Sequence, residues 1–217
     1  YMKYPYGKQE ILAEDIEAVV EVLKSDFITQ GEAVAKFEQT LNRFCGVKYA
    51  TAVNSATAAL HIACLSLGVG KGDTVWTSPN SFVASANCAL YCGAKVDFVD
   101  IDAQTKCMSI TKLTEKLEHA KKTQALPKVL IPVHFAGQSA EMHQIKQLSQ
   151  QYGFYIIEDA SHALGGQYKN FPVGSCKYSD VTVFSFHPVK VITSGEGGIA
   201  TTNNKNPQWL TSRQSGT

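Results

Sequence analysis

The sequence predicts a three-layer α/β/α fold, in which helices cover both faces of a mostly parallel, seven-stranded sheet. Seven short apolar runs of strand length recur after residue 48, and helical patterns separate most of them. Alternation of this kind supplies the crossover connections that parallel strands require. The chain has 217 residues, which is enough to bury one sizeable core.

Composition and charge narrow the classes of function. Hydrophobic residues make up 44% of the chain and charged residues 18%, as in an ordinary globular protein. The formal net charge is +1 and no basic stripe stands out, so nucleic acid is not an expected partner. No apolar run is long enough to cross a membrane, and the first ten residues lack the apolar core of a signal peptide. The six cysteines form no C-x-x-C pair and indicate buried, reduced thiols, so we expect a cytoplasmic protein.

Two helices are expected in the first 45 residues. Residues 13–25 place apolar side chains on one helical face, and residues 32–45 repeat the pattern after the break SDFITQG at 25–31. The strands that follow are predicted at 49–54, 74–78, 95–100, 128–134, 154–159, 181–186 and 197–202. Helices are predicted between them at 56–67, 81–92, 109–122 and 139–152. The last two strands are joined by a loop without a helical pattern, which leaves one strand free to run antiparallel.

Ligands of such folds gather at the carboxyl ends of the strands, so the residues that follow the strands carry the most information. The first strand leads into Ser55, Ala56 and Thr57, where small and hydroxyl residues open a helix. Free N–H groups, a favourable dipole and hydroxyl donors at such a place predict a phosphate cradle. The alternative is a plain helix cap made by Ser55 or Asn54, with nothing bound.

An aromatic residue and a carboxylate follow two further strands. Phe82 comes after the second strand, where it either packs in the core or stacks on a flat ligand. Asp159 ends an apolar strand, and a carboxylate there can hold a protonated ring nitrogen by a charge-assisted bond. His162 follows on the same side of a turn; a structural cap with a satisfied histidine is the alternative. A metal held by Asp159, His162 and either His134 or His187 lacks a tight ligand spacing, so no metal is expected.

A lysine follows the last of these strands. Lys190 comes just after Pro188, beside the predicted sheet edge, where partial desolvation would make its amine a usable nucleophile. Ser185 at the end of the same strand is a second candidate for donating a hydrogen bond to the phosphate, or else it is an ordinary strand residue. Taken in order, the strand ends offer a phosphate cradle, an aromatic, an acid, a hydroxyl and a lysine. Pyridoxal phosphate has a phosphate, a flat ring, a basic ring nitrogen and an aldehyde that condenses with lysine, so one cofactor would use all five.

Four motifs give the chain a resemblance to a known family. They are NSATAAL at 54–60, SPNSFVASAN at 78–87, EDASHALGG at 158–166 and SFHPVKVITSGEGG at 185–198. With them the chain resembles the large domain of the DegT/DnrJ/EryC1/StrS sugar aminotransferases, within the aspartate aminotransferase-like enzymes of fold type I. The resemblance implies that residues 1–217 form the pyridoxal-phosphate-binding large domain, with a helical segment at 1–47. It also implies that the family's small carboxyl-terminal domain is absent from this chain.

The resemblance implies a role for each site residue. Lys190 would bind the cofactor aldehyde and later move protons, Asp159 would pair with the ring nitrogen, and His162 would lie near the ring hydroxyl. Phe82 would stack on the ring. The phosphate would be held by Ala56, Thr57 and Ser185, with Ser55 a weaker candidate. The nucleotide sugar would touch Tyr6, Asp26, Phe27, Ile28 and Thr29, a segment that would otherwise be a solvated loop.

The implied reaction moves an amino group from L-glutamate to C4 of a UDP-linked 4-keto-6-deoxy-N-acetyl sugar. SHALG after the acid and TQG at 29–31 favour the branch of the family that serves pseudaminic acid biosynthesis. The family's dehydrating relatives carry histidine where this chain has Lys190, which favours amino transfer over dehydration. Family resemblance also implies a homodimer for the full-length enzyme. The alternatives are a non-catalytic module that binds the cofactor or a nucleotide sugar as a sensor, and a fragment without activity.

Overall fold

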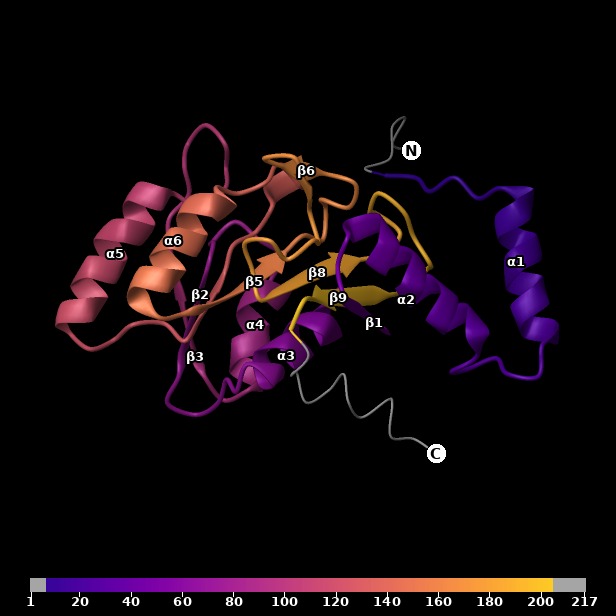
Figure 1. The fold of residues 1–217 in the computed structure, drawn as a ribbon, viewed down its shortest axis with the longest axis horizontal. Helices are drawn as coiled ribbons and strands as arrows, with labels where there is room; N and C mark the ends of the chain where they lie inside the picture. Colours follow the sequence, from indigo (N-terminus) through magenta and orange to yellow (C-terminus); the bar gives the residue numbers. More distant parts are fainter. Residues whose placement is uncertain (1–6, 205–217) are drawn as a thin grey trace, which may run out of the picture.

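The computed structural model describes residues 7–204, which form a seven-stranded sheet between two layers of helices (Figure 1). The strand order is β1-β9-β8-β5-β4-β2-β3, and β9 runs antiparallel to the other six strands, which share one direction. The predicted mostly parallel sheet is therefore confirmed, and the strand without a crossover helix is the antiparallel one. The strands are β1 (Tyr49–Val53), β2 (Thr74–Thr77), β3 (Lys95–Phe98), β4 (Val129–Ile131), β5 (Tyr155–Asp159), β8 (Val181–Ser185) and β9 (Gly198–Thr202).

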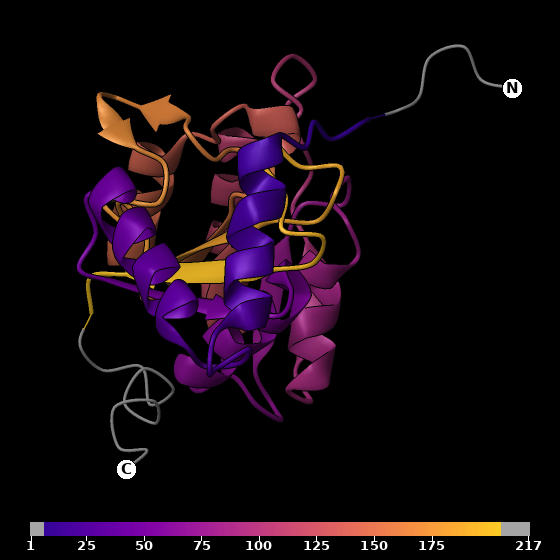
Figure 2. The same ribbon diagram turned by 90° about the vertical axis from the view of Figure 1, so that its right-hand side faces the viewer.

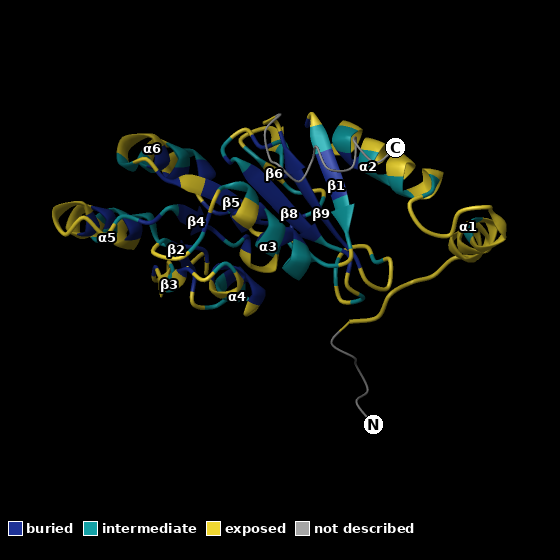
Figure 3. Ribbon diagram, turned by 90° about the horizontal axis from the view of Figure 1, so that it is seen from below, coloured by how far each residue is buried: buried dark blue, intermediate teal, exposed yellow. Residues whose placement is uncertain are grey.

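Alternation along the strands builds a core on each face of the sheet. On β8, Val183 packs with the helices α3 and α4, whereas its neighbour Phe184 packs with α2 on the opposite face. The helices α5 and α6 cover Leu130 and Ile156 on the same face as α2. Figure 3 shows the buried residues concentrated in the strands between these layers. The helices are α1 (Ala13–Lys24), α2 (Glu32–Cys45), α3 (Ala56–Ser66), α4 (Ala84–Tyr91), α5 (Ile110–Lys122) and α6 (Met142–Tyr152).

Three differences from the predicted elements have local causes. β4 ends at Ile131 rather than at residue 134, because Pro132 has no N–H to continue the ladder. The helix predicted from residue 81 begins at Ala84, because residues 78–83 form the turn that leaves β2. A hairpin of β6 (Gln167–Tyr168) and β7 (Phe171–Pro172) was not predicted. Its turn residues Lys169 and Asn170 are both left-handed, and Figure 2 shows the hairpin projecting from the helical layers.

The first helix forms as predicted, but the rest of the described chain does not cover its apolar face. No residue of α1 is buried, and Val19 and Leu23 are 60% and 65% exposed. Figures 1 and 3 show α1 standing apart from the sheet. The helix end is held locally, where the N–H of Leu12 donates to the side chain of Asp15 (2.9 Å). The sequence also predicts a last helix near residue 206, which lies outside the described residues.

Two further properties of the described chain concern membrane-spanning helices and disulfide bonds. None of the helices between residues 7 and 204 combines the length and the apolarity that a bilayer crossing requires. All six cysteines are free thiols, and only Cys92 among them is not buried.

The loop of residues 186–197 joins β8 to β9 and carries Lys190, and we call it the lysine loop. The direction of β9 brings the two ends of this loop to one edge of the sheet. Its first residue, Gly198, pairs with Ser185, the last residue of β8. Gly198 also lies against the start of α3: a Cβ there would come 2.3 Å from the backbone carbon of Ser55. Only glycine allows the strand and the helix to approach this closely. The carboxyl ends of β5 and β8 thus meet the amino-terminal end of α3.

Candidate active site

A cavity of about 360 Å³ opens at this edge of the sheet. It is lined from α3, from the turn after β2, from the ends of β5 and β8, and from the loop between β8 and β9. The structure brings into it all eight residues that the sequence predicted to bind a cofactor. They are Ser55, Ala56, Thr57, Phe82, Asp159, His162, Ser185 and Lys190.

Lys190 is carried by the loop that joins β8 to β9. Its N–H donates to the carbonyl of His187 (2.9 Å), and the hydroxyl of Thr193 ties the base of the loop to the carbonyl of Phe186 (2.8 Å). The Nζ atom lies 2.6 Å from Nε2 of His162. Burial lowers the pKa of the Lys190 amine, and the charge of Asp159 opposes part of that shift. The lysine therefore has more neutral amine at a given pH than a solvated lysine.

Asp159 is held by hydroxyl donors on both oxygens of its carboxylate. Ser161 donates to Oδ1 through its hydroxyl (2.6 Å) and through its backbone N–H (3.2 Å). The hydroxyl of Ser85, in the first turn of α4, donates to Oδ2. The carboxylate is 5% exposed. These bonds fix the direction in which the anion faces the cavity.

His162 lies in the turn after β5, with its ring in contact with the amine of Lys190. Burial lowers the pKa of its imidazole, the charge of Lys190 lowers it further, and the charge of Asp159 raises it. The net effect favours a neutral ring. A neutral ring can accept a hydrogen bond at Nε2 from the ammonium of Lys190.

The start of α3 offers hydrogen-bond donors to an anion. Ser55 is the helix cap, and its oxygen accepts from the N–H of Ala58 (3.1 Å), which holds this hydroxyl against the helix. The N–H groups of Ala56 and Thr57 bond to no acceptor among residues 7–204. Ser185 accepts weakly from the N–H of His187 (3.4 Å), which leaves its hydroxyl proton for another acceptor. The N–H groups of Ala56 and Thr57 and the hydroxyls of Thr57 and Ser185 thus line the cavity at a helix start, where the dipole favours a phosphate.

Phe82 is not a core residue, although core packing was the ordinary expectation. Its side chain is 72% exposed and forms part of the cavity wall, because it belongs to the turn before α4 rather than to the helix. An exposed ring at the mouth of a cavity can cover a flat ligand.

The predicted substrate segment does not reach this cavity. Asp26, Phe27, Ile28 and Thr29 are exposed in the connection between α1 and α2, and none of them lines it. Tyr6 lies outside the described residues. The assignment of these five residues to a nucleotide sugar remains a prediction.

Several residues in or beside the cavity were not predicted to belong to the cofactor site. Ser85 and Ser161 hold Asp159, and the sequence signal that could have suggested them is their place inside two of the motifs. His187 and Glu196 also line the cavity, at opposite ends of the lysine loop and 4.0 Å apart. No three histidine, cysteine or acidic side chains among the described residues form a group that could hold a metal ion.

The sequence of residues 9–209 matches the model of the DegT/DnrJ/EryC1/StrS aminotransferase family. The chain therefore belongs to that family. One similar relative is the UDP-4-amino-4,6-dideoxy-N-acetyl-beta-L-altrosamine transaminase of Campylobacter jejuni, which is 44% identical over 92% of this chain and 51% of its own length. The chain spans about half the length of the curated relatives that it matches.

Solved structures of aminotransferases have the same fold. The Helicobacter pylori aminotransferase PseC, described as involved in pseudoaminic acid biosynthesis, aligns with a TM-score of 0.87 and 34% identity. That alignment covers 96% of this chain and 54% of PseC. The sugar aminotransferase Spr1654 of Streptococcus pneumoniae, in a structure described as its PLP-form, aligns with a TM-score of 0.84 and 31% identity. It covers 97% of this chain and 56% of Spr1654.

Pyridoxal phosphate is the cofactor of the DegT/DnrJ/EryC1/StrS family, and the donor set of this cavity fits it. The start of α3 offers N–H and hydroxyl donors for a phosphate, and Asp159 offers a buried carboxylate for a ring nitrogen. Lys190 offers an amine whose pKa is lowered by burial. Because Gly198 has no side chain, β9 lies close to the start of α3, whose N–H groups could bind a phosphate.

Proposed function

We propose that the protein containing this chain is a pyridoxal-phosphate-dependent aminotransferase of nucleotide sugars. It would transfer the amino group of L-glutamate to C4 of a UDP-linked 4-keto-6-deoxy-N-acetyl sugar, giving the amino sugar and 2-oxoglutarate. The observation that carries the proposal is the convergence of Lys190, Asp159 and the start of α3 on one cavity. Family membership and the similarity to the altrosamine transaminase support the type of substrate.

Each cavity residue has a task that its chemistry supports. When bound, pyridoxal phosphate supplies an aldehyde and an electron-withdrawing ring. Asp159 would keep the ring nitrogen protonated, because its anion is buried and held in one direction. Lys190 would take and return protons at the cavity, with His162 as the neighbour that accepts a hydrogen bond from its ammonium. Phe82 would cover the ring and limit the access of water.

The phosphate end of the cofactor would be held by Ala56, Thr57 and Ser185. Ser55 would be the weaker candidate, because its hydroxyl is held in place as the cap of α3 by the N–H of Ala58. The nucleotide sugar would contact Tyr6 and the segment of residues 26–29, which in this chain lies outside the cavity. Such a contact requires another part of the assembly to bring the segment and a cavity together. A homodimer, which the family resemblance supports, would allow it.

The same resemblance supports the remaining features of the proposal. Residues 1–217 would be the cofactor-binding large domain of a longer protein, with a helical segment at 1–47. The protein would act in the cytoplasm, in the synthesis of sugars such as pseudaminic acid. The similarity to PseC favours this pathway among those of the family.

The proposal is tested with the intact protein in two steps. Addition of pyridoxal phosphate should produce an absorbance band near the visible edge in the wild type but not in Lys190→Ala. Glutamate should then change that band, and one member of a panel of UDP- and dTDP-4-keto sugars should restore it. A band that forms but does not respond to glutamate would instead support a non-catalytic binding module. Absence of the band in the wild type would refute the proposal.

A further inference from the structure

His134 contacts both of the residues that end β5. It is 1% exposed and follows β4. Its backbone N–H donates to the carbonyl of Asp159 (3.0 Å), and its ring Nε2 lies 2.8 Å from a carboxylate oxygen of Glu158. The other ring nitrogen, Nδ1, accepts the N–H of Ala140 (3.2 Å). One side chain and its own backbone therefore hold the end of the strand that carries Asp159.

These contacts determine where the proton of the His134 ring resides. Because Nδ1 accepts a hydrogen bond, it carries no proton, and the proton is on Nε2. The Nε2–H group then donates to the carboxylate of Glu158. Both ring nitrogens are occupied, so the ring has neither a donor nor an acceptor left for a ligand. His134 is thus suited to hold other groups in place rather than to exchange protons with a substrate.

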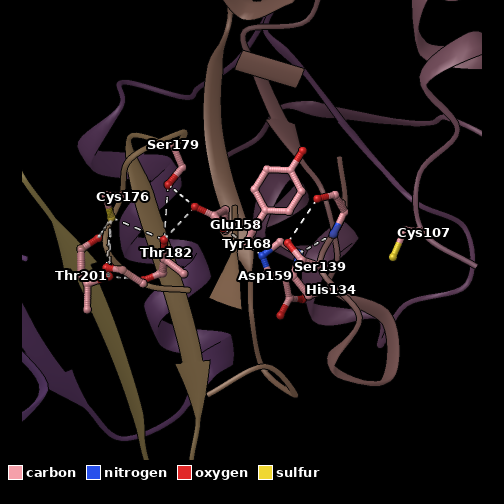
Figure 4. Close-up of polar contacts among 12 residues, drawn as sticks. Cys107, His134, Ser139, Glu158, Asp159, Tyr168, Cys176, Ser179, Thr182 and Thr201 are labelled. Carbon is pink, nitrogen blue, oxygen red and sulfur yellow. Dashed lines mark hydrogen bonds and ion pairs between the residues drawn. The ribbon is translucent and has the colours of Figure 1, made fainter. Parts of the chain in front are cut away.

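Glu158 is the buried acceptor at the centre of a network of hydrogen bonds. Its carboxylate accepts from the hydroxyls of Ser179 and Thr182 (3.1 Å for Thr182) in addition to His134, as Figure 4 shows in part. Burial alone would raise the pKa of Glu158, but the hydrogen bond from His134, the electrostatic interaction with the same ring and the hydrogen bonds from the two hydroxyls outweigh it and lower the pKa. The carboxylate stays ionised, and a buried ionised carboxylate binds its donors firmly.

The segment that follows His134 also reaches the turn that carries His162. Ala136 and Gly137 are both left-handed, with φ angles of 52° and 87°. A Cβ at Gly137 would come 3.0 Å from the carbonyl oxygen of His162, so the two backbones are packed together. His134 is thus connected to Asp159 by a backbone hydrogen bond and to the turn of His162 by the packing of the next few residues.

We propose that His134 is a positioning residue, which binds Glu158 and thereby fixes Asp159 and His162 in the geometry that pyridoxal phosphate requires. The inference rests on the proposed function, since that function supplies the cofactor. Glu158 and Asp159 are consecutive on β5, so their side chains point to opposite sides of the strand. The network around Glu158 therefore anchors the strand from one side, while Asp159 faces the cavity on the other.

The test compares two substitutions at His134 in the intact protein. In His134→Gln the side-chain amide can place a donor where Nε2 stands, whereas in His134→Asn the shorter amide reaches only the place of Nδ1. We expect His134→Asn to raise the dissociation constant of pyridoxal phosphate about tenfold, the size of one lost hydrogen bond to a charged group. We expect His134→Gln to remain within about threefold of the wild type.

The pH titration of the absorbance of the bound cofactor is the second readout. In His134→Asn the midpoint should move to higher pH, because a displaced Asp159 no longer keeps the ring nitrogen protonated. When the ring nitrogen is neutral, the other basic atom of the bound cofactor binds its proton more tightly, so the pKa of that atom rises. Ser149→Ala is the matched control, because Ser149 bonds the carbonyl of Phe154 at the opposite end of the same strand (2.6 Å). The control should lower the melting temperature but leave the midpoint unchanged.

A milder substitution covers the case in which His134→Asn does not fold. Thr182→Val removes one donor to Glu158 at nearly constant volume and should move the midpoint in the same direction by a smaller amount. The inference is overturned if His134→Asn or Thr182→Val titrates like the wild type, or if His134→Gln loses as much affinity as His134→Asn. A wild-type protein that does not bind pyridoxal phosphate would overturn the proposed function as well.

Discussion

The Nζ atom of Lys190 and the Nε2 atom of His162 lie 2.6 Å apart, although each group can carry a positive charge. Burial lowers both pKa values, and the charge of Lys190 lowers that of His162 further. The charge of Asp159 acts in the opposite direction on both groups. Because two positive charges at this distance repel each other, the pair favours states in which at least one of the two groups is neutral.

The amine of Lys190 should become reactive at a lower pH than an ordinary lysine. Its pKa is lowered by burial, so the neutral amine appears below the usual value of 10.5. Asp159→Asn removes the charge that opposes this shift and should move the midpoint lower still. Reductive labelling of Lys190 by a small aldehyde, followed by mass spectrometry across pH, measures the midpoint. A midpoint at or above 10.5 in the wild type contradicts this expectation.

Lys190→Met should raise the pKa of His162. The substitution keeps most of the side-chain volume and removes the positive charge that lowers this pKa, while the charge of Asp159 remains. A titration of the imidazole by nuclear magnetic resonance would follow the change. Lys122→Met, at the exposed end of α5, is the control and should have no effect. An unchanged pKa of His162 in Lys190→Met would mean that the charge of Lys190 has no influence on the ring.

Thr57→Ala and Ser185→Ala should weaken the binding of pyridoxal phosphate but not of pyridoxal, which has no phosphate. A hydrogen bond to a charged group contributes about 1.5–3 kcal/mol, so each dissociation constant should rise by roughly one to two powers of ten. Fluorescence titration with both compounds measures the difference. Ser66→Ala, at the other end of α3, removes a hydroxyl that bonds the carbonyl of Ala63 and serves as the control. Equal losses for the two compounds would show that these hydroxyls do not contact the phosphate.

Gly198→Ala should destabilise the fold by about 1–3 kcal/mol, the usual cost of an overpacked site. The added Cβ would lie 2.3 Å from the backbone carbon of Ser55, and a backbone cannot rotate away as a side chain can. Urea unfolding measures the loss. Gly70→Ala is the matched control, since a Cβ at that position meets no atom within 4 Å. A stability of Gly198→Ala equal to that of Gly70→Ala would be inconsistent with this close contact.

Glu158 should make the protein sensitive to acid. Its pKa is lower in the folded chain than the ordinary value of 4.5, so its contribution to stability is complete above that value. The contribution disappears as the pH falls through the folded pKa, because the carboxylate must then be protonated. Glu158→Gln cannot lose a charge and should show a shallower fall in the free energy of unfolding below pH 4.5. Parallel acid dependence in the two proteins would exclude Glu158 as the source.

Most of the fold could be predicted from the sequence, because periodicity and strand-end residues are local signals. The eight cavity residues could be named before the structure because carboxyl ends of parallel strands meet at one edge. The contact of Ser85 with Asp159 could not be predicted. It joins residues 74 positions apart and depends on how α4 packs against the sheet. The short β6–β7 hairpin was missed because two paired residues on each side leave almost no pattern to detect.

The roles of charged and aromatic residues were harder to predict than their location. The sequence favours Phe82 as a core residue. Its ring is exposed because α4 begins only at Ala84, so that Phe82 lies in the turn before the helix. The apolar stripe of α1 predicts a buried face, but no residue of this helix is buried. The sequence of a helix indicates which face is apolar, whereas burial also requires another surface to pack against that face. His134 gives no local sign of its contact with Glu158, which is made across two neighbouring strands.

The position of β9 sets the time at which a newly made chain could first hold a ligand. This strand lies between β1 and β8, and its pairing with β1 joins Tyr49 to Thr202. Closing a loop of about 150 residues is entropically costly and slow compared with local pairing. On the ribosome, β1 and α3 emerge long before β9. Because Gly198 of β9 lies against the start of α3, the cavity that this helix shares with Ser185 and Lys190 is complete only after β9 has joined the sheet. A ligand of the cavity would therefore stabilise the last step of folding rather than the first.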